Sequence, residues 1–214
     1  TSLQYQKPNL VKCEKCDLIF SELLNLKFEN LYEDVEDKLY IDQIPFKKKY
    51  FESTLKKIEK YLGKEKNVLE IGSYYGIFGS LINPHVKSYI GLELSRHAVD
   101  YAKKEYSLNF VNKTIEEYIN EVNNVDIVLM SHVIEHLDKP FENIQSIANK
   151  MSKSSVLIFS TYNMDSLIAK VLGKNYQWIM PMHKYYFTKK VLKNILEKYN
   201  LEIVETISDT HIIS

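Results

Sequence analysis

The stretch Val68-Leu69-Glu70-Ile71-Gly72-Ser73-Tyr74-Tyr75-Gly76 decides the fold of this chain. Its first four residues form a short apolar run with one acid, which is typical of a buried strand. Gly72 allows a sharp turn where the strand ends, and Gly76 allows a helix to start close to a ligand. The stretch therefore predicts a strand, a tight loop and a helix, an arrangement that places a ligand beyond the carboxyl end of the strand.

Downstream of this stretch, short apolar runs alternate with segments of helical periodicity. Strands are predicted at 86–92, 109–111, 125–130 and 155–159, with a less buried one at 201–207. Helices are predicted at 95–106, from 114, at 140–151 and at 188–199. Strands that alternate with helices build a parallel sheet covered by helices on both faces. We therefore expect an α/β fold, a Rossmann-like doubly wound and mostly parallel sheet.

The residues before the stretch divide into a small hairpin, a connector and a helix. Apolar side chains at three- and four-residue steps between 45 and 62 predict an amphipathic helix, with Gly63 as its C-terminal cap. Residues 21–45 have no sustained period and are interpreted as a connector that covers part of the core. We expect a hairpin and connector at 1–44 and a main domain at 45–214.

Composition narrows the class of protein. Hydrophobic residues make up 45% and charged residues 26% of the chain, which excludes a disordered or collagen-like protein. The 28 basic and 28 acidic side chains cancel, which disfavours non-specific binding to nucleic acid or an anionic membrane. No apolar run approaches the ~20 residues of a membrane-spanning helix, and no secretory signal opens the chain. We expect a cytoplasmic protein whose partners include neither nucleic acid nor membrane.

The loop and its acidic neighbours indicate which ligand it holds. Dinucleotide-binding loops have glycine where Tyr74 stands, so a pyrophosphate is disfavoured, and Glu70 beside the loop favours a cation or an amine. Glu93 ends the next strand, ~20 residues downstream, where a carboxylate can accept hydrogen bonds from both ribose hydroxyls. The combination indicates a ribose-bearing ligand with an amino group and no phosphates, and S-adenosylmethionine is such a ligand.

At these residues the chain resembles the class I S-adenosylmethionine-dependent methyltransferases, in particular their small-molecule branch. The Glu-x-Gly-x-x-x-Gly loop is similar to their first motif, Glu93 to their ribose-binding acid, and Asp126–Leu137 to the motif around their fourth strand. The resemblance covers about residues 64–207 and implies a site for S-adenosyl-L-methionine. Its implied residues are Glu70, Gly72, Ser73, Tyr74, Gly76, Glu93, Leu94, Thr114, Ile115, Ser131 and His132. Thr114 stands where the family usually has an acid that recognises the adenine amine.

The resemblance also implies where the methyl acceptor binds. The insertion at about 162–187 is too long for a simple connection and would form a substrate lid, with Trp178 and Tyr185 as substrate contacts. His136 and His183 are candidates for the base that deprotonates an oxygen acceptor. The alternatives are a lid of aromatic residues that merely covers a sheet edge, and a His136 that only hydrogen-bonds within its loop.

The expected function is methylation of a small polar metabolite, by O-methylation of a sugar or a related hydroxylated compound, in a monomer or homodimer. Two other classes stay open. A nicotinamide-dependent Rossmann oxidoreductase would share the fold, although it would have the third glycine of the dinucleotide fingerprint. A non-catalytic regulator would bind S-adenosylmethionine without turnover.

Two further patterns are typical of metal sites. Cys13 and Cys16, the only cysteines, have half the ligands of a structural zinc site, so a site completed from outside this chain, a plain hairpin and a redox pair all stay open. Some sugar-modifying family members have an N-terminal zinc ribbon whose second half resembles this pair, which would place the missing cysteines before Thr1. The run His132–His136 matches a zinc-peptidase pattern, but it follows a buried strand in a short loop, so we expect no peptidase.

Overall fold

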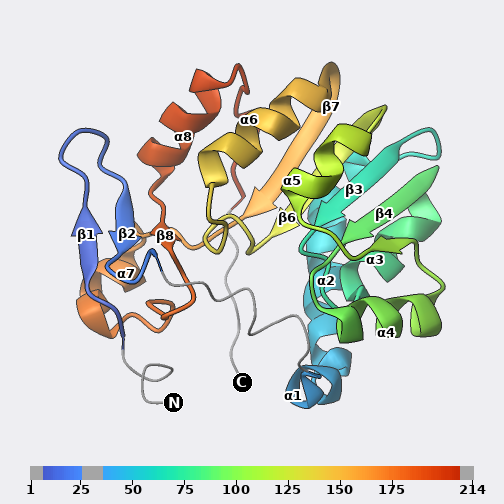
Figure 1. Ribbon diagram of the computed structural model, residues 1–214, viewed down its shortest axis with the longest axis horizontal. Coiled ribbons are helices and arrows are strands. Elements are labelled where there is room, and N and C mark those ends of the chain that lie inside the picture. Colours follow the sequence, from blue (N-terminus) through green and yellow to red (C-terminus); the bar gives the residue numbers. More distant parts are fainter. Residues whose placement is uncertain (1–6, 26–35, 208–214) are drawn as a thin grey trace.

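The computed structural model describes residues 7–25 and 36–207, and its centre is a five-stranded parallel sheet (Figure 1). The strand order is β5-β4-β3-β6-β7. The strands are β3 (Asn67–Ile71), β4 (Ser88–Leu92), β5 (Phe110–Val111), β6 (Val125–Ser131) and β7 (Met151–Ser160). The predicted fold class is confirmed. Because β3 pairs with β4 on one side and β6 on the other, the order reverses at β3, and the carboxyl end of this strand opens onto the ligand crevice of such sheets.

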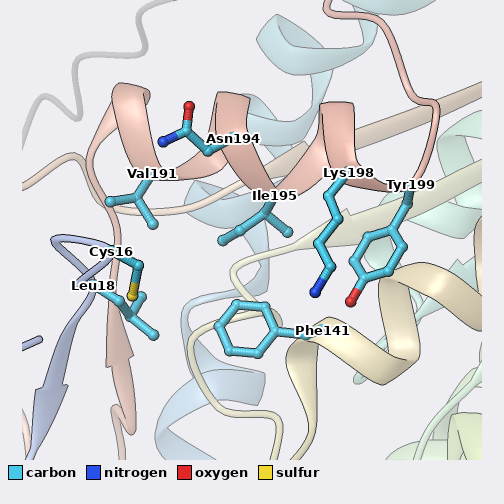
Figure 2. A pocket seen from close by; sticks show the side chains of 8 residues that line it. All are labelled: Cys16, Leu18, Phe141, Val191, Asn194, Ile195, Lys198 and Tyr199. Atoms are coloured by element: carbon cyan, nitrogen blue, oxygen red, sulfur yellow. The ribbon is translucent and has the colours of Figure 1, made fainter.

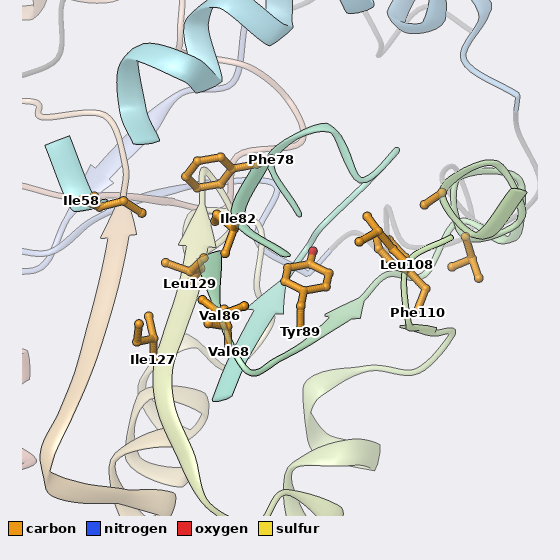
Figure 3. Packing of buried hydrophobic residues seen from close by; sticks show 12 residues of the cluster. Ile58, Val68, Phe78, Ile82, Val86, Tyr89, Leu108, Phe110, Ile127 and Leu129 are labelled. Atoms are coloured by element: carbon orange, nitrogen blue, oxygen red, sulfur yellow. The ribbon is translucent and has the colours of Figure 1, made fainter. Parts of the chain in front are cut away.

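Helices cover both faces of this sheet because the strand residues are apolar on both sides. They are α2 (Ile44–Ile58), α3 (Ile77–Ile82), α4 (Arg96–Tyr106), α5 (Ile115–Tyr118) and α6 (Pro140–Lys150). On one face, Phe78 of α3 packs in a buried cluster with Val68 and Ile127, as Figure 3 shows. On the other face, Ile147 of α6 lies in a cluster with Leu69. Successive residues of β3 thus point to opposite layers, as the pleat of a strand requires.

Local sequence signals start several of these helices. The hydroxyl of Ser95 accepts a hydrogen bond from the N–H of Ala98 and caps α4. Thr114 and Glu117 form a reciprocal capping box at α5. Thr188 caps α8 (Lys189–Lys198), the last helix of the described residues. Such caps satisfy backbone donors that have no partner within the helix, which is why the predicted helix starts agree with the structure.

A second, three-stranded antiparallel sheet lies beside the main one. The predicted N-terminal hairpin, β1 (Leu10–Lys12) and β2 (Ile19–Ser21), is present, and β2 also pairs with β8 (Tyr185–Tyr186). Between β7 and β8 lies the insertion predicted as a lid, which includes α7 (Leu167–Leu172). The hairpin and the insertion, which the sequence presents as separate parts, therefore share one sheet (Figure 1).

The structure differs from the sequence predictions at three places. Residues 201–207 form no strand: the carboxylate of Glu205 accepts hydrogen bonds from Tyr61 at 2.9 Å and Lys60 at 2.7 Å, which holds this segment against the end of α2 instead of the sheet edge. Gly63 does not cap α2, because the helix tightens into a 3₁₀ turn at Glu59–Tyr61 that ends before it. The connector contains a short helix, α1 (Lys38–Asp42), which Asp37 caps.

None of the helices within 7–25 and 36–207 is both long enough and apolar enough to cross a bilayer.

Candidate functional site

The loop after β3 adopts a conformation that requires its two glycines. Gly72 and Gly76 have φ angles of +68° and +75°, a region that residues with a Cβ rarely adopt. A Cβ on Gly72 would also collide with the side chain of Val133, and one on Gly76 would lie 2.8 Å from the Cβ of Ala102. The loop backbone therefore lies close to Val133 in the segment that follows β6, and close to Ala102 of α4.

Glu93 ties this loop to the end of β4. It is buried, and its Oε1 accepts hydrogen bonds from the N–H groups of Leu94 at 2.7 Å and Ser95 at 2.8 Å. Its Oε2 accepts one from the N–H of Tyr74 at 2.8 Å. Burial raises the pKa of Glu93, and the three N–H groups act against that rise. The carboxylate is thus held in one orientation, and of its roughly four acceptor sites one, on Oε2, is left for a ligand by the bonds within the described residues.

Glu70 lies at the base of the same loop in a drier environment. It is buried, and the hydroxyl of Tyr89 donates to its Oε2. Burial raises the pKa of Glu70 to about 8 and outweighs the hydrogen bond from Tyr89, which acts to lower it; the charge of Glu93 adds a smaller upward contribution. Among the described residues Glu70 has no cationic partner within ion-pair distance, so at neutral pH it is mostly protonated. A bound cation would ionise it.

The first helix covers this acidic pair, which the sequence did not predict. The ring of Tyr40 in α1 lies 4.5 Å from the ring of Tyr74 and 5.3 Å from that of Tyr75. Asp37 accepts a hydrogen bond from the Tyr74 hydroxyl at 2.8 Å. Burial, followed by the charge of Glu70, raises the pKa of Tyr40. A connector without periodicity contains no signal for such a cover, because only its tertiary contacts define it.

The segment after β5, implied as an adenine contact, is held by the start of α5. The Thr114 hydroxyl accepts from the N–H of Glu117 at 3.2 Å, and Ile115 is buried in the core. The amide of Asn112 donates to the carbonyls of Glu93 at 2.9 Å and Leu94 at 2.7 Å. The hydroxyl of Ser73 donates to the carbonyl of Leu92 at 3.1 Å. These bonds join the ends of β3, β4 and β5 into one rim.

A chain of stacked rings begins where β6 ends, directly after Ser131. His132, with φ at 55°, packs its ring 4.5 Å from Tyr162, which stacks on Trp178 at 4.3 Å. Tyr162 also stacks at 5.5 Å on His183, whose ring lies 4.6 Å from that of His136. The structure thus brings together both histidines and Trp178, three of the residues predicted for the acceptor side. It adds Tyr162, the first residue of the predicted lid, which was not predicted as a site residue.

Both histidines of this pair are neutral and oriented by the backbone. Nδ1 of His136 lies 3.2 Å from the carbonyl of Met182, and Nδ1 of His183 lies 2.8 Å from that of Trp178. A carbonyl only accepts, so each Nδ1 carries the proton and each Nε2 keeps a lone pair. Burial lowers the pKa of His136, and burial together with the nearby His136 lowers the pKa of His183 to about 4.

Glu135, next to His136, was not predicted as a site residue outside the peptidase pattern. It is 1% exposed, and its Oε1 lies 3.3 Å from Nδ1 of His132. Burial acts to raise the pKa of Glu135, but the His132 bond and the two neighbouring histidines outweigh it and hold the pKa below its usual value. Its Oε2 is buried without a hydrogen-bond partner in the described part of the chain. An anionic oxygen thus lies beside the two histidines.

Tyr185, predicted as a substrate contact, does not join this group of rings. Its ring packs 5.9 Å from Phe141, and its hydroxyl donates to the carbonyl of Asp138 at 3.3 Å. The neighbouring Tyr186 has its ring 6.1 Å from His183 instead. Because successive residues of a strand point to opposite faces, the two tyrosines of β8 cannot both face the histidines.

Cys13 and Cys16 lie in the hairpin, away from these residues. Both are free thiols, and backbone N–H groups of Cys16 and Lys15 lower the pKa of the Cys13 thiol. Within 7–25 and 36–207 no third metal-ligating side chain joins them. Cys16 instead borders an apolar pocket of about 280 Å³ between the hairpin, α6 and α8 (Figure 2). Whether outside ligands complete a metal site stays a prediction.

Comparison with known proteins gives one family and several partial likenesses. The sequence model of a methyltransferase domain family matches residues 45–206. The ubiquinone biosynthesis O-methyltransferase of Coxiella burnetii is 25% identical over 130 residues, which are 57% of this chain and 56% of that protein. The chain thus spans little more than half the length of this curated relative.

Two solved structures share the fold. A SAM-dependent methyltransferase from Archaeoglobus fulgidus superposes with a TM-score of 0.65 at 23% identity, over 83% of this chain and 86% of that one. The plantazolicin methyltransferase BpumL, solved in complex with SAH, superposes with a TM-score of 0.53 at 20% identity, over 62% of this chain and 55% of that one.

Proposed function

The chain belongs to the methyltransferase domain family that matches residues 45–206, and from this premise we propose that it methylates an oxygen of a small polar acceptor. The methyl donor is S-adenosylmethionine. The observation that carries the proposal is the pair of buried carboxylates at the carboxyl ends of β3 and β4, where the sheet order reverses.

The chemistry of this pair fits the proposed cofactor. When bound, S-adenosylmethionine supplies an electrophilic methyl group on a sulfonium. Glu93, held by three backbone N–H groups, would accept a hydrogen bond from the ribose at Oε2. Glu70 would ionise beside the amino group of the methionine part, because its pKa of about 8 leaves it without a charge until a cation arrives. Gly72 supports this assignment, since its missing side chain keeps the loop close to Val133.

The residues beyond β6 would bind the acceptor. Tyr162 and Trp178 offer flat apolar faces that exclude water and suit a ring-shaped molecule. The Nε2 lone pairs of His136 and His183 would face the acceptor hydroxyl at the point where it loses its proton. Holding the acceptor and the cofactor in line would contribute more to the rate than the base does, because orientation can lower the barrier to such a transfer by ~7–11 kcal/mol. Oxygen is favoured as acceptor atom, and the names of the curated relatives, which are O-methyltransferases, agree with it.

A panel of hydroxylated compounds tests the proposal. Purified protein is incubated with S-adenosylmethionine and phenols, catechols or sugars, and S-adenosylhomocysteine is measured by mass spectrometry. Formation of one S-adenosylhomocysteine per methyl ether supports the proposal. Methylation at nitrogen would overturn the choice of acceptor atom, and tight binding without turnover on any acceptor would favour a regulator. A thermal shift with NAD⁺ or NADP⁺ but none with S-adenosylmethionine would overturn the cofactor assignment.

A further inference from the structure

We propose that Glu135, His136 and His183 form a binding site for one divalent transition-metal ion of the zinc class. One potential ligand atom from each of these residues lies within 4.8 Å of the others. The three come from two segments, the loop after β6 and the turn before β8, so the fold and not the local sequence brings them together. The His-x-x-Glu-His pattern contributes only its last two residues, because His132 bonds to Glu135 instead of facing the cluster.

The hydrogen bonds of the two histidines suit a metal. The Nδ1 atoms of His136 and His183 donate to backbone carbonyls, which leaves both Nε2 atoms free to coordinate. Metal-bound histidines almost always have such a partner for their second nitrogen, because it fixes the ring and the tautomer.

The unpaired oxygen of Glu135 is the second, independent observation. Glu135 is 1% exposed, and its Oε2 has no hydrogen-bond partner among the described residues, although a buried carboxylate oxygen without a partner is costly. Its other oxygen accepts from His132, in the way that outer hydrogen bonds orient a metal-bound carboxylate. A cation at this point would satisfy the orphaned oxygen.

The ligand set selects the kind of ion. Two imidazoles and one carboxylate leave a fourth position open, as in catalytic zinc sites. Magnesium and calcium prefer oxygen ligands, so two nitrogens disfavour them. The ion would thus be Zn²⁺ or a neighbouring transition metal such as Co²⁺ or Fe²⁺, held beside the ring of Tyr162, which stacks on His183 at 5.5 Å.

The role of this metal site in catalysis rests on the proposed function, whereas metal binding itself does not. An acceptor hydroxyl at the open position would lose its proton more readily, because a bound metal lowers the pKa of an attached oxygen. That proton goes to solvent, the oxygen forms its bond to the methyl carbon, and the carbon–sulfur bond breaks with its electron pair left on sulfur. No oxidant or reductant is needed. The metal ion would thus favour deprotonation of the acceptor hydroxyl, which the proposed function otherwise assigns to a free imidazole.

Binding of Co²⁺ and Zn²⁺ tests the site without cofactor or acceptor. The protein carries Cys13→Ser and Cys16→Ser, so that the hairpin thiols cannot bind the added ion, and it is stripped with a chelator. We expect one Co²⁺ per chain, with visible absorption bands of a low-coordinate site, and displacement by Zn²⁺. The variants His183→Ala and Glu135→Gln should each weaken binding at least tenfold, whereas His85→Ala, at an exposed histidine, should not change it.

Several outcomes would overturn the inference. They are a parent protein that binds no ion at millimolar Co²⁺, binding that survives both variants, and binding that His85→Ala abolishes. Since a buried substitution can unfold the chain, each variant is checked by circular dichroism, and His183→Gln replaces His183→Ala if the latter does not fold. Metal binding without methyl transfer would leave the site standing and reject the proposed function. Methyl transfer by a protein that binds no ion would support the proposed function and reject the metal site.

Discussion

Replacing Glu70 by Gln should abolish a proton release that accompanies cofactor binding. In the cofactor-free protein the pKa of Glu70 is about 8, so at pH 7 about nine tenths of the molecules carry a neutral Glu70. A cationic amino group beside this carboxyl favours its ionised form. Binding at pH 7 should therefore release about 0.9 proton per molecule, and affinity should rise about tenfold between pH 6 and pH 7.

Isothermal titration calorimetry measures this release, because the observed heat changes with the ionisation enthalpy of the buffer in proportion to the protons exchanged. Glu70→Gln cannot ionise, so its heat should not depend on the buffer and its affinity should be flat between pH 6 and pH 7. Glu105→Gln, at an exposed carboxyl of α4, is the matched control and should behave as the wild type. Equal proton release in the wild type and in Glu70→Gln would refute the assignment of Glu70 to the amino group.

Glu70 also affects the stability of the fold, and its raised pKa determines whether stability rises or falls with pH. A group whose folded-state pKa is raised stabilises the fold below its unfolded pKa, and this contribution is lost as pH rises through the folded value. Between pH 4.5 and about 8 Glu70 should therefore cost the cofactor-free protein up to about 5 kcal/mol. Thermal melts should show a midpoint that falls over this window in the wild type and much less in Glu70→Gln.

Three further substitutions examine other parts of the site. Gly72→Ala should lower the free energy of unfolding in urea by about 2 kcal/mol or more, because the added Cβ collides with Val133 and the φ angle is unfavourable for alanine. The control Gly173→Ala should cost about 1 kcal/mol, because its φ is +49° but no atom lies within 4 Å of the added Cβ. Equal losses in the two variants would contradict this reasoning. Tyr40→Ala should weaken S-adenosylmethionine binding about tenfold, the effect of removing a covering aromatic, whereas Leu39→Ala, at a residue 75% exposed, should leave the dissociation constant unchanged. Trp178→Ala should leave cofactor affinity nearly intact and reduce turnover, and a loss of cofactor binding in a folded variant would show that the acceptor pocket is placed wrongly.

The central sheet could be predicted because its strands are short apolar runs between clear turn signals. Val125 to Met130 can only be a buried strand, and Gly72 and Gly76 mark the loop at which the order reverses. The segment 201–207 alternates in the same way as a strand, but among the described residues no strand pairs with it, and the partners of Glu205 hold it elsewhere. Periodicity predicts what a segment can form, whereas tertiary contacts decide what it does form.

The candidate site could be predicted only in part, for a similar reason. Glu70 lies near the end of β3 and Glu93 directly follows β4, and since the two strands are adjacent and parallel, the nearness of the two acids follows from topology. The meeting of His183 with Glu135 depends on the backbone bond from Lys184 N–H to the Glu135 carbonyl at 2.8 Å and on the pairing of β8 with β2, which no local pattern indicates. Tyr186 packs against His183 whereas Tyr185 packs against Phe141, because a shift of one residue along a strand reverses the face.

The most direct test of the account is calorimetric titration of S-adenosylmethionine into the wild type and into Glu93→Ala. A hydrogen bond from a ribose hydroxyl to a carboxylate contributes ~1.5–3 kcal/mol, so its removal corresponds to a loss of about 10- to 100-fold in affinity. The account predicts this loss in a variant whose circular dichroism spectrum is unchanged, with Glu93→Gln between the two because it keeps one acceptor oxygen. Equal affinity in the wild type and in Glu93→Ala would contradict the placement of the cofactor at the ends of β3 and β4.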